Sequence, residues 1–259
     1  MIKKLFFITL VIYLLFVYNL NTQEQSIDLI EKKSNYITIN WTKGIIYSEY
    51  TSLNNNNIDI DKLEKITFEN AYHHLMLALL DLYLESGKTL KESLKNDPAL
   101  QKKFHHIKEK IQIKKKIVYL NKITYLLSFS FFDYFNHDQN YYIQDLKNAY
   151  YSPIKQEKQF NGIIIYISKE HFKPALRFKI FSSTGKLILY LPVKENIYYS
   201  NDSFIYQNPD INQPYVIYTE KSLNENDIII DQKDIQFLIA TKKLFDINSF
   251  KVILYDKTQ

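Results

Sequence analysis

The first part of the chain carries a clear alternation of hydrophobic and polar positions. Ile37, Ile39 and Trp41 fall on one side of residues 36–42, and polar residues occupy the positions between them. A period of two residues is typical of a strand with one buried side. Gly44 interrupts the alternation, which predicts a bulge or a close approach of two backbones.

Between residues 61 and 86 the hydrophobic positions recur at steps of three and four, which predicts a long helix with one apolar face. That face consists of Leu63, Ile66, Ala71, Leu75, Ala78, Leu79 and Leu82. Gly87 stands where a left-handed cap would end the helix. Thr89 and Glu92 then form a capping box, which predicts the start of a short second helix.

Asp97 and Pro98 predict a third helix, because aspartate caps helices well and proline fits the first helical position. Residues 111–135 follow as two predicted strands, joined by a tight turn at Asn121–Lys122. The domain expected over 36–135 is therefore of the α+β class. Its mixed or antiparallel sheet should have the helices packed on one face.

The second half of the chain predicts a linker and a smaller unit. Residues 136–159 are polar and indicate a linker, and a second α+β unit is expected over 160–259. Its first strand opens at Gly162, Pro174 keeps the residue before it out of helical space, and Gly185 turns the chain between two strands. Later elements are expected as strands at 215–219, 228–230 and 250–255, and as a helix after Asp231 with Ile235, Leu238 and Ile239 on its face.

The amino terminus has the pattern of an export signal. Lys3 and Lys4 precede an uncharged apolar run over residues 5–18. This run is shorter than the ~20 residues that usually span a bilayer. Residues 1–22 are therefore predicted to be a signal peptide or an uncleaved anchor in the inner membrane, and residues 23–35 a tether. We expect the body of the protein to lie in the periplasm.

Composition narrows the chemistry. The chain has no cysteine, which excludes disulfides, thiolate metal sites, a cysteine nucleophile and a lipid-modified cysteine. The net charge is +5, but Arg177 is the single arginine and no nucleic-acid motif accompanies it. We expect no nucleic-acid partner. The densest basic stretch, residues 102–116, is interpreted as a solvated helix face and hairpin edge, with anionic lipid or an acidic partner as the alternatives.

The histidines do not show a metal-binding pattern. His73–His74 and His105–His106 are adjacent pairs on predicted helices, whereas a zinc pair on one helix needs a spacing of four residues. Only a composite site using His74, His105 or His106 would bind metal. The sequence also has no glycine-rich phosphate loop and no nucleophile-elbow motif. We expect no catalytic residue and no cofactor, and we interpret the loop at residues 168–173 as connective.

Two stretches resemble a known family. "ITINWTKGIIYSE", followed by "GKTLKESL" and "DPALQKKF", is similar to the exported twenty-kilodalton outer-membrane lipoprotein family. The same domain type resembles the amino-terminal part of the flagellar assembly protein T. The positions that carry this likeness are Trp41, Gly44, Gly87 and Pro98.

The second stretch, "GIIIYISKEHFKPAL" with the following Gly-Lys turn, resembles a segment that follows that domain in some exported bacterial members. It keeps Gly162, Pro174 and Gly185. Tyr166, Ser168 and Lys169 stand where that pattern has aspartate, arginine and glycine. The lipobox cysteine is also missing, so lipid anchoring does not carry over.

The resemblance implies a non-enzymatic envelope protein with a structural or assembly role, with envelope or flagellar-motor proteins as its partners. Two other hypotheses remain open. One is a metal-dependent hydrolase that uses the helix histidines. The other is a small-ligand or glycan-binding module lined with tyrosine, of which the chain has 22.

Overall fold

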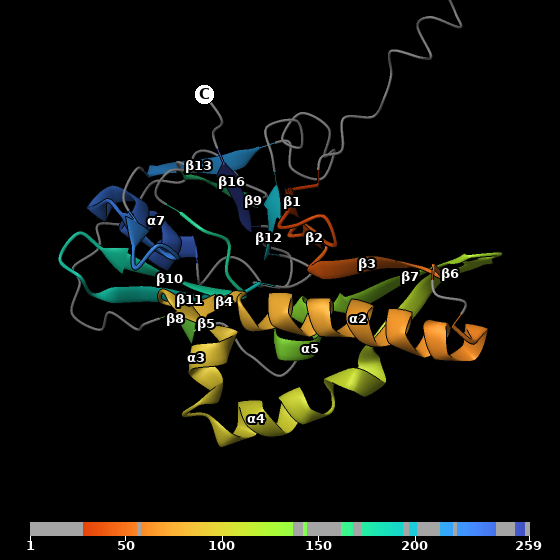
Figure 1. The fold of residues 1–259 in the computed structure, drawn as a ribbon. Coiled ribbons are helices and arrows are strands. Elements are labelled where there is room, and N and C mark those ends of the chain that lie inside the picture. Colours follow the sequence, from red (N-terminus) through yellow and green to blue (C-terminus); the bar gives the residue numbers. More distant parts are fainter. Residues whose placement is uncertain are drawn as a thin grey trace, which may run out of the picture.

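The computed structural model describes residues 28–55, 58–136, 142–143, 162–167, 172–193, 197–200, 213–219, 222–241 and 252–256. The predicted signal or anchor at 1–22, most of the predicted linker and loop residues 168–171 lie outside the described residues. The chain is of the α+β class, as predicted: helices and largely antiparallel sheets alternate along it (Figure 1).

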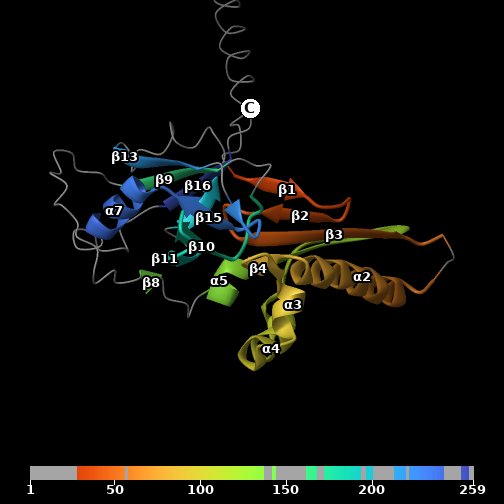
Figure 2. The same cartoon turned by 90° about the vertical axis from the view of Figure 1, so that its left-hand side faces the viewer.

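The first sheet is antiparallel throughout and has the order β1-β2-β3-β7-β6. Its strands are β1 (Ile30–Lys32), β2 (Ile37–Asn40), β3 (Ile45–Leu53), β6 (Gln112–Tyr119) and β7 (Lys122–Ser130). Helix α2 (Ile60–Leu80) covers one face of this sheet (Figures 1 and 2). Strand β1 falls inside the stretch that the sequence predicted to be a tether, so that prediction is wrong for residues 30–32.

Helix α2 forms where the predicted apolar face meets the sheet. The Asp59 carboxylate caps it by accepting hydrogen bonds from the backbone N–H groups of Asp61 at 3.0 Å and Lys62 at 3.3 Å. Its buried residues are Leu63, Thr67, Ala71, Leu75, Ala78 and Leu79. The Ser48 hydroxyl of β3 donates to the Ala71 carbonyl oxygen at 2.8 Å, which joins the helix directly to the sheet.

The helix ends earlier than predicted, at Leu80 rather than at residue 86. The chain continues as a small hairpin of β4 (Tyr83–Glu85) and β5 (Lys88–Thr89). Leu82 and Leu84 are both buried, which fits a period of two as well as the helical period. Ser86 and Gly87 both have positive φ, 48° and 74°, as tight hairpin turns require. Gly87 therefore belongs to a hairpin turn and is not a helix cap.

The two helix starts predicted downstream are confirmed. α3 (Leu90–Leu94) opens with the capping box, in which Thr89 accepts from the Glu92 N–H at 3.2 Å and Glu92 accepts from the Thr89 N–H at 2.8 Å. α4 (Pro98–His105) has Pro98 at its start, and the Asp97 carboxylate accepts from the Leu100 N–H at 2.9 Å. A 3-10 turn, η1 (Ile107–Lys110), leads into β6.

The end of the first unit differs from the prediction. The hairpin turn lies at Leu120–Asn121, one residue earlier than expected, and strand β7 stops at Ser130. Residues expected to extend that strand form helix α5 (Phe131–Asn136) instead. The Phe131 N–H donates to the Gly44 carbonyl oxygen at 2.8 Å, and Phe131, Phe132 and Phe135 are all buried. Three-dimensional packing of these rings favours the helix here.

The second half forms two further sheets. One is mixed, in the order β14-β15-β10-β11-β8, and the other is parallel, in the order β12-β16-β9-β13. Their strands are β8 (Tyr142–Ile143), β9 (Gly162–Ile167), β10 (Arg177–Ser182), β11 (Leu187–Pro192), β12 (Ile197–Ser200), β13 (Pro214–Thr219), β14 (Ser222–Leu223), β15 (Asp227–Ile230) and β16 (Val252–Asp256).

Helix α7 (Gln232–Thr241) packs against the parallel sheet, where the Phe237 ring stacks on Tyr215 at 3.5 Å between centroids. Ile235 and Leu238 are buried, as predicted for this helix, and the side chain of Ile239 lies outside the described residues. The strands expected at 215–219, 228–230 and 250–255 correspond to β13, β15 and β16. Strand β8 lies within the predicted linker and pairs with β11.

The close backbone approach predicted at Gly44 is present in the hydrogen bond from the Phe131 N–H, and a side-chain ring lies close to Gly44 as well. Gly44 has φ of 63°, and a Cβ atom built on it would lie 2.1 Å from the Phe132 ring. Gly185 provides a matched comparison: its φ is 79°, but a Cβ atom there would meet nothing within 4 Å. Both positions have left-handed backbone. Of the two, only Gly44 lies so close to a neighbour that a side chain would not fit.

Gly44→Ala is expected to lower the free energy of unfolding by about 3 kcal/mol or more, because it adds a clash in the core to the left-handed backbone cost. Gly185→Ala should lose only about 1 kcal/mol, the backbone cost alone. Urea unfolding followed by circular dichroism measures both. Equal losses would show that the contact with Phe132 does not constrain the chain.

Candidate functional site

The most elaborate cluster of side-chain interactions lies where the first sheet meets the second half of the chain. Its centre is Tyr199 of β12, a buried residue. The Tyr199 ring lies edge-on to Trp41 at 5.9 Å and also contacts Phe132 and Phe172. The Thr42 hydroxyl donates to the Tyr199 carbonyl oxygen at 2.6 Å. We call this region the junction.

The Tyr199 hydroxyl holds the backbone of Ala175. It accepts from the Ala175 N–H at 2.9 Å and donates to the Ala175 carbonyl oxygen at 2.8 Å. Burial raises the pKa of Tyr199 far above its usual range, so the hydroxyl keeps the proton that it donates. The next residue, Leu176, donates its N–H to the Tyr83 carbonyl oxygen at 2.9 Å. The segment after Pro174 is thereby attached to both halves of the chain.

Asn136, at the end of α5, performs a similar task from the other side. Its side-chain amide donates to the carbonyl oxygens of Leu176 at 2.7 Å and Val193 at 2.8 Å. Its amide oxygen accepts from Arg177 Nε at 3.2 Å, and Arg177 also donates to the Phe135 carbonyl oxygen. Asn136 is fully buried. The sequence placed this residue at the start of a polar linker, and that interpretation is wrong for Asn136.

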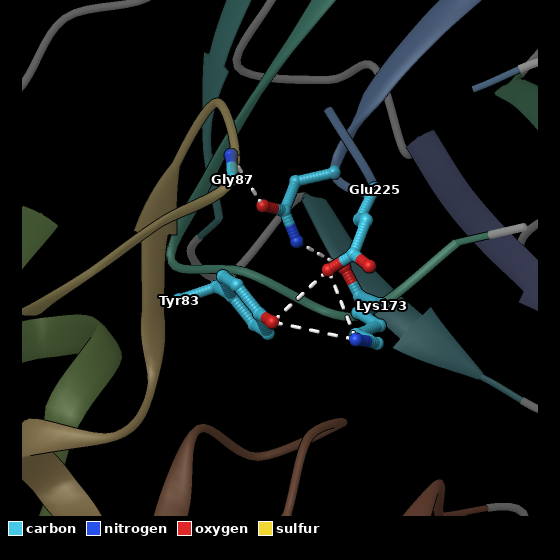
Figure 3. Close-up of polar contacts among 5 residues, drawn as sticks. Tyr83, Gly87, Lys173 and Glu225 are labelled. Carbon is cyan, nitrogen blue, oxygen red and sulfur yellow. Dashed lines mark hydrogen bonds and ion pairs between the residues drawn. The ribbon is translucent and has the colours of Figure 1, made fainter. Parts of the chain in front are cut away.

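A third group of contacts joins two tight turns, one from each half (Figure 3). The Gly87 N–H of the β4–β5 turn donates to Asn226 Oδ1 at 2.7 Å. The Asn226 amide then donates to the Lys173 carbonyl oxygen at 2.7 Å. Asn224 and Glu225 have positive φ, 52° and 64°, so the β14–β15 connection is a left-handed turn like its partner. A Cβ atom on Gly87 would lie 2.9 Å from the Asn224 carbonyl oxygen, which explains the glycine.

An ionic contact covers the rim of these turns (Figure 3). Glu225 Oε2 accepts from the Tyr83 hydroxyl at 3.0 Å and from Lys173 Nζ at 2.9 Å. Hydrogen bonding from Lys173 and Tyr83 lowers the pKa of Glu225, and the same bond raises the pKa of Lys173. The Lys173 and Glu225 side chains are 54% and 53% exposed, and water screens ion pairs that are exposed in this way. The rim therefore adds little stability.

One cluster beside the turns carries groups that catalyse reactions in other settings. Lys179 Nζ donates to Ser86 Oγ at 2.9 Å, and Asp227 Oδ1 accepts from the Lys179 backbone N–H at 3.2 Å. Asp227 is buried, and burial raises the pKa of its carboxyl. A serine–lysine pair can transfer acyl groups only when the lysine nitrogen has a free lone pair. Here Lys179 Nζ also lies 3.6 Å from the Glu85 carboxylate, so the amine is held between Ser86 and an ion-pair partner.

The histidines take separate structural roles. His74 is half-buried between two tyrosine rings, Tyr36 at 4.7 Å and Tyr50 at 5.5 Å. His106 pairs with Glu109 at 3.5 Å, and His105 is exposed at the end of α4. Within the described part of the chain, no group of three or more histidine, aspartate or glutamate side chains could hold a metal ion.

The positions that carried the resemblance divide into two groups. Trp41, Gly44, Gly87 and Pro174 lie at or beside the junction, and the Trp41 indole donates to Glu31 at 2.8 Å. Pro98, Gly162 and Gly185 serve the start of α4, the start of β9 and the β10–β11 turn. The junction residues Asn136, Tyr199 and Asn226 carry no periodic or motif signal in the sequence, so pattern analysis missed them.

Comparisons with known proteins leave the family open. No protein-family model matches this chain, and no curated protein matches it either. The resemblance to the twenty-kilodalton lipoprotein family therefore stays a prediction. None of the helices in the described ranges combines the length and hydropathy needed to cross a membrane.

Tyr199→Phe is expected to lower the free energy of unfolding by about 2–3 kcal/mol, because two buried backbone groups of Ala175 lose their partner. Tyr218→Phe is the matched control: Tyr218 is 70% exposed, and removing its hydroxyl should change stability by less than about 0.5 kcal/mol. Denaturant unfolding compares the two. Similar effects would mean that the Ala175 backbone does not depend on the hydroxyl.

Asn226→Ala should cost about 2 kcal/mol, because it leaves the Gly87 N–H and the Lys173 carbonyl oxygen unpaired in a partly buried place. The adjacent Glu225→Gln removes only the exposed ion pair and should cost less than about 1 kcal/mol. Thermal unfolding at low and high salt checks the order, since only the Glu225 effect should fall with salt. The reverse order would show that the ionic rim, rather than the buried amide, holds the turns together.

Proposed function

We propose that this protein is an exported, non-enzymatic component of the cell envelope, with a structural or assembly role in the periplasm. The observation that carries the proposal is the apolar run at residues 5–18 behind Lys3 and Lys4. Its partners are proteins of the envelope. The flagellar motor is one such assembly, and that choice rests on the resemblance alone.

The contacts of Asp28 support a tether on its amino-terminal side. Asp28 is held by Asn40, whose amide donates to its carboxylate at 2.8 Å, and by Lys43 at 2.7 Å. Asp28 also pairs with Ser200 as an isolated bridge. Asp28 is thus bound to the folded body at a place close to the junction. The ten steps from residue 18 to Asp28 can extend at most about 35 Å, so an uncleaved anchor would keep the body near the membrane.

The junction supports a structural role for the body. Its aromatic rings, buried amides and docked turns join the two halves of the chain at many points. A protein that acts by holding partners in fixed positions needs its own parts to be joined in this way. The side chains that could carry chemistry, His74 and Lys179, are engaged in stacking and in an ion pair. Nothing in their geometry favours the hydrolase alternative.

The export step can be tested by interrupting the apolar run in the full chain. Leu10→Arg with Leu14→Arg should retain the protein in the cytoplasm, since each charge costs about 3 kcal/mol in a membrane segment. Leu10→Ile with Leu14→Ile is the control and should be exported like the original chain. Cell fractionation with a carboxy-terminal tag measures the distribution. Cytoplasmic location of the unaltered chain would overturn the proposal.

The assembly role needs its own measurement. Cross-linking of the tagged full chain in envelope fractions should recover at least one envelope protein repeatedly. Failure to recover any protein would contradict a structural role.

Metal analysis of the purified protein should find no stoichiometric zinc, and finding it would favour the hydrolase instead.

A further inference from the structure

The β6–β7 hairpin is exposed in a way that the fold does not explain. All eight residues of β6 are exposed, on both faces of the sheet. Hydrophobic side chains gather at its tip: Tyr119 is 66% exposed, Leu120 88% and the neighbouring Leu53 of β3 57%. Isolated exposed hydrophobic residues are ordinary, whereas a contiguous group usually marks a contact surface. The hairpin extends from the end of the first sheet farthest from α7 (Figures 1 and 2).

Strand register shows which side chains share a face. Leu53, Lys122 and Tyr119 are paired in one row across β3, β7 and β6, and Ile117 lies two residues behind Tyr119. Side chains two residues apart on a strand point to the same face. The intervening rows point toward α2, where Lys116 and the Tyr125 hydroxyl bond to Glu64. Leu53, Tyr119 and Ile117 therefore share the face that turns away from the helix, with Lys122 between Leu53 and Tyr119.

Lysines surround this apolar group. Lys122 lies within the terminal row, and Lys115 lies on the same face two residues behind Ile117. Lys114 adds a further charge at the β-bulge of β6. Glu49 of β3 lies on this face in the same row as Lys115, behind the rows of Tyr119 and Ile117. The tip thus combines exposed hydrophobic side chains with one lysine, Lys122, in its own row, and further positive charge lies behind it.

We propose that the β6–β7 hairpin tip docks onto an anionic membrane surface. Aliphatic and tyrosine side chains partition into the interfacial region of a bilayer, and lysines just behind them attract acidic headgroups. The outer edge of β6 pairs with no strand in the described part of the chain, and unpaired backbone groups are costly in hydrocarbon. Contact is therefore limited to the tip and to interfacial depth.

The other occupants fit less well. A second copy pairing edge to edge through β6 would bring two runs of lysine, residues 114–116, against one another, and like charges opposite each other are unfavourable. An acidic protein surface would form ion pairs with the lysines, but it would not bury the exposed Leu120 at the tip. The reach of the proposed tether, about 35 Å from residue 18 to Asp28, also keeps a membrane close. This last argument rests on the proposed export segment, and the charge and exposure of the hairpin do not.

The chain has no cysteine, so a single introduced cysteine can report from one place. Leu120→Cys in the full chain is labelled with an environment-sensitive fluorophore and mixed with vesicles of phosphatidylcholine containing phosphatidylglycerol. The emission should shift to shorter wavelength, and a lipid-attached quencher should reduce it. Ser183→Cys, in the exposed β10–β11 turn, is the matched control and should show neither effect. The control is necessary because the amino-terminal run can hold the whole chain on a vesicle.

Charge is tested separately. In vesicles of phosphatidylcholine alone, or when Lys115→Gln and Lys122→Gln are added, quenching of the Leu120 label should fall several-fold, because each lysine near an anionic surface contributes to binding. A Leu120 label that stays as solvent-exposed as the Ser183 label in anionic vesicles overturns the proposal. Protection of the Leu120 label by an acidic envelope protein in the absence of anionic lipid also overturns it, in favour of a protein partner. Either failure leaves export and envelope location, which fractionation measures, unaffected.

Discussion

The backbone of Ala175 and Leu176 lies inside the protein, where its polar groups cannot reach water, and the junction is built to supply their partners. The Tyr199 hydroxyl forms hydrogen bonds with the N–H and the carbonyl oxygen of Ala175. The Asn136 amide donates a hydrogen bond to the carbonyl oxygen of Leu176. An unpaired polar group in such a place costs about 1–3 kcal/mol. Because the partners come from α5 and β12, satisfying this short segment fixes the two halves of the chain relative to each other.

The other contacts of the junction follow from that placement. The rings of Trp41 and Phe132 fill the space around Tyr199, and Gly44 leaves room for Phe132. The two left-handed turns then meet at a distance that only glycine at position 87 permits. Side chains of types that serve in catalysis elsewhere make structural contacts here, as Lys179 does with Ser86. The exposed β6–β7 hairpin contrasts with this, because its side chains are not needed for packing.

Local signals in the sequence anticipated much of the fold and little of the candidate site. The alternation at Ile37, Ile39 and Trp41 and the capping residues Thr89 and Asp97 act within a few residues, so their structures could be predicted. Residues 81–87 were misassigned because the buried positions there fit more than one period. Residues 131–136 were misassigned because the apolar run of β7 continues into Phe131 and Phe132 without a break. Long-range packing decided for a hairpin at the first place and for a helix at the second. Asn136 and Tyr199 act on residues about 40 and 24 positions away, a separation that no local pattern records.

The sequence by itself determined the class of the fold, the starts of the helices, the absence of cysteine chemistry and the apolar run that predicts export. These depend on composition and on neighbouring residues, whose interactions are the same in any tertiary context. Only the tertiary structure decided where the two halves meet, which polar side chains are buried and which hydrophobic ones remain outside. Burial is a property of the whole folded chain, so Leu120 and Leu176 look alike as letters and differ completely in the surface that they present to water.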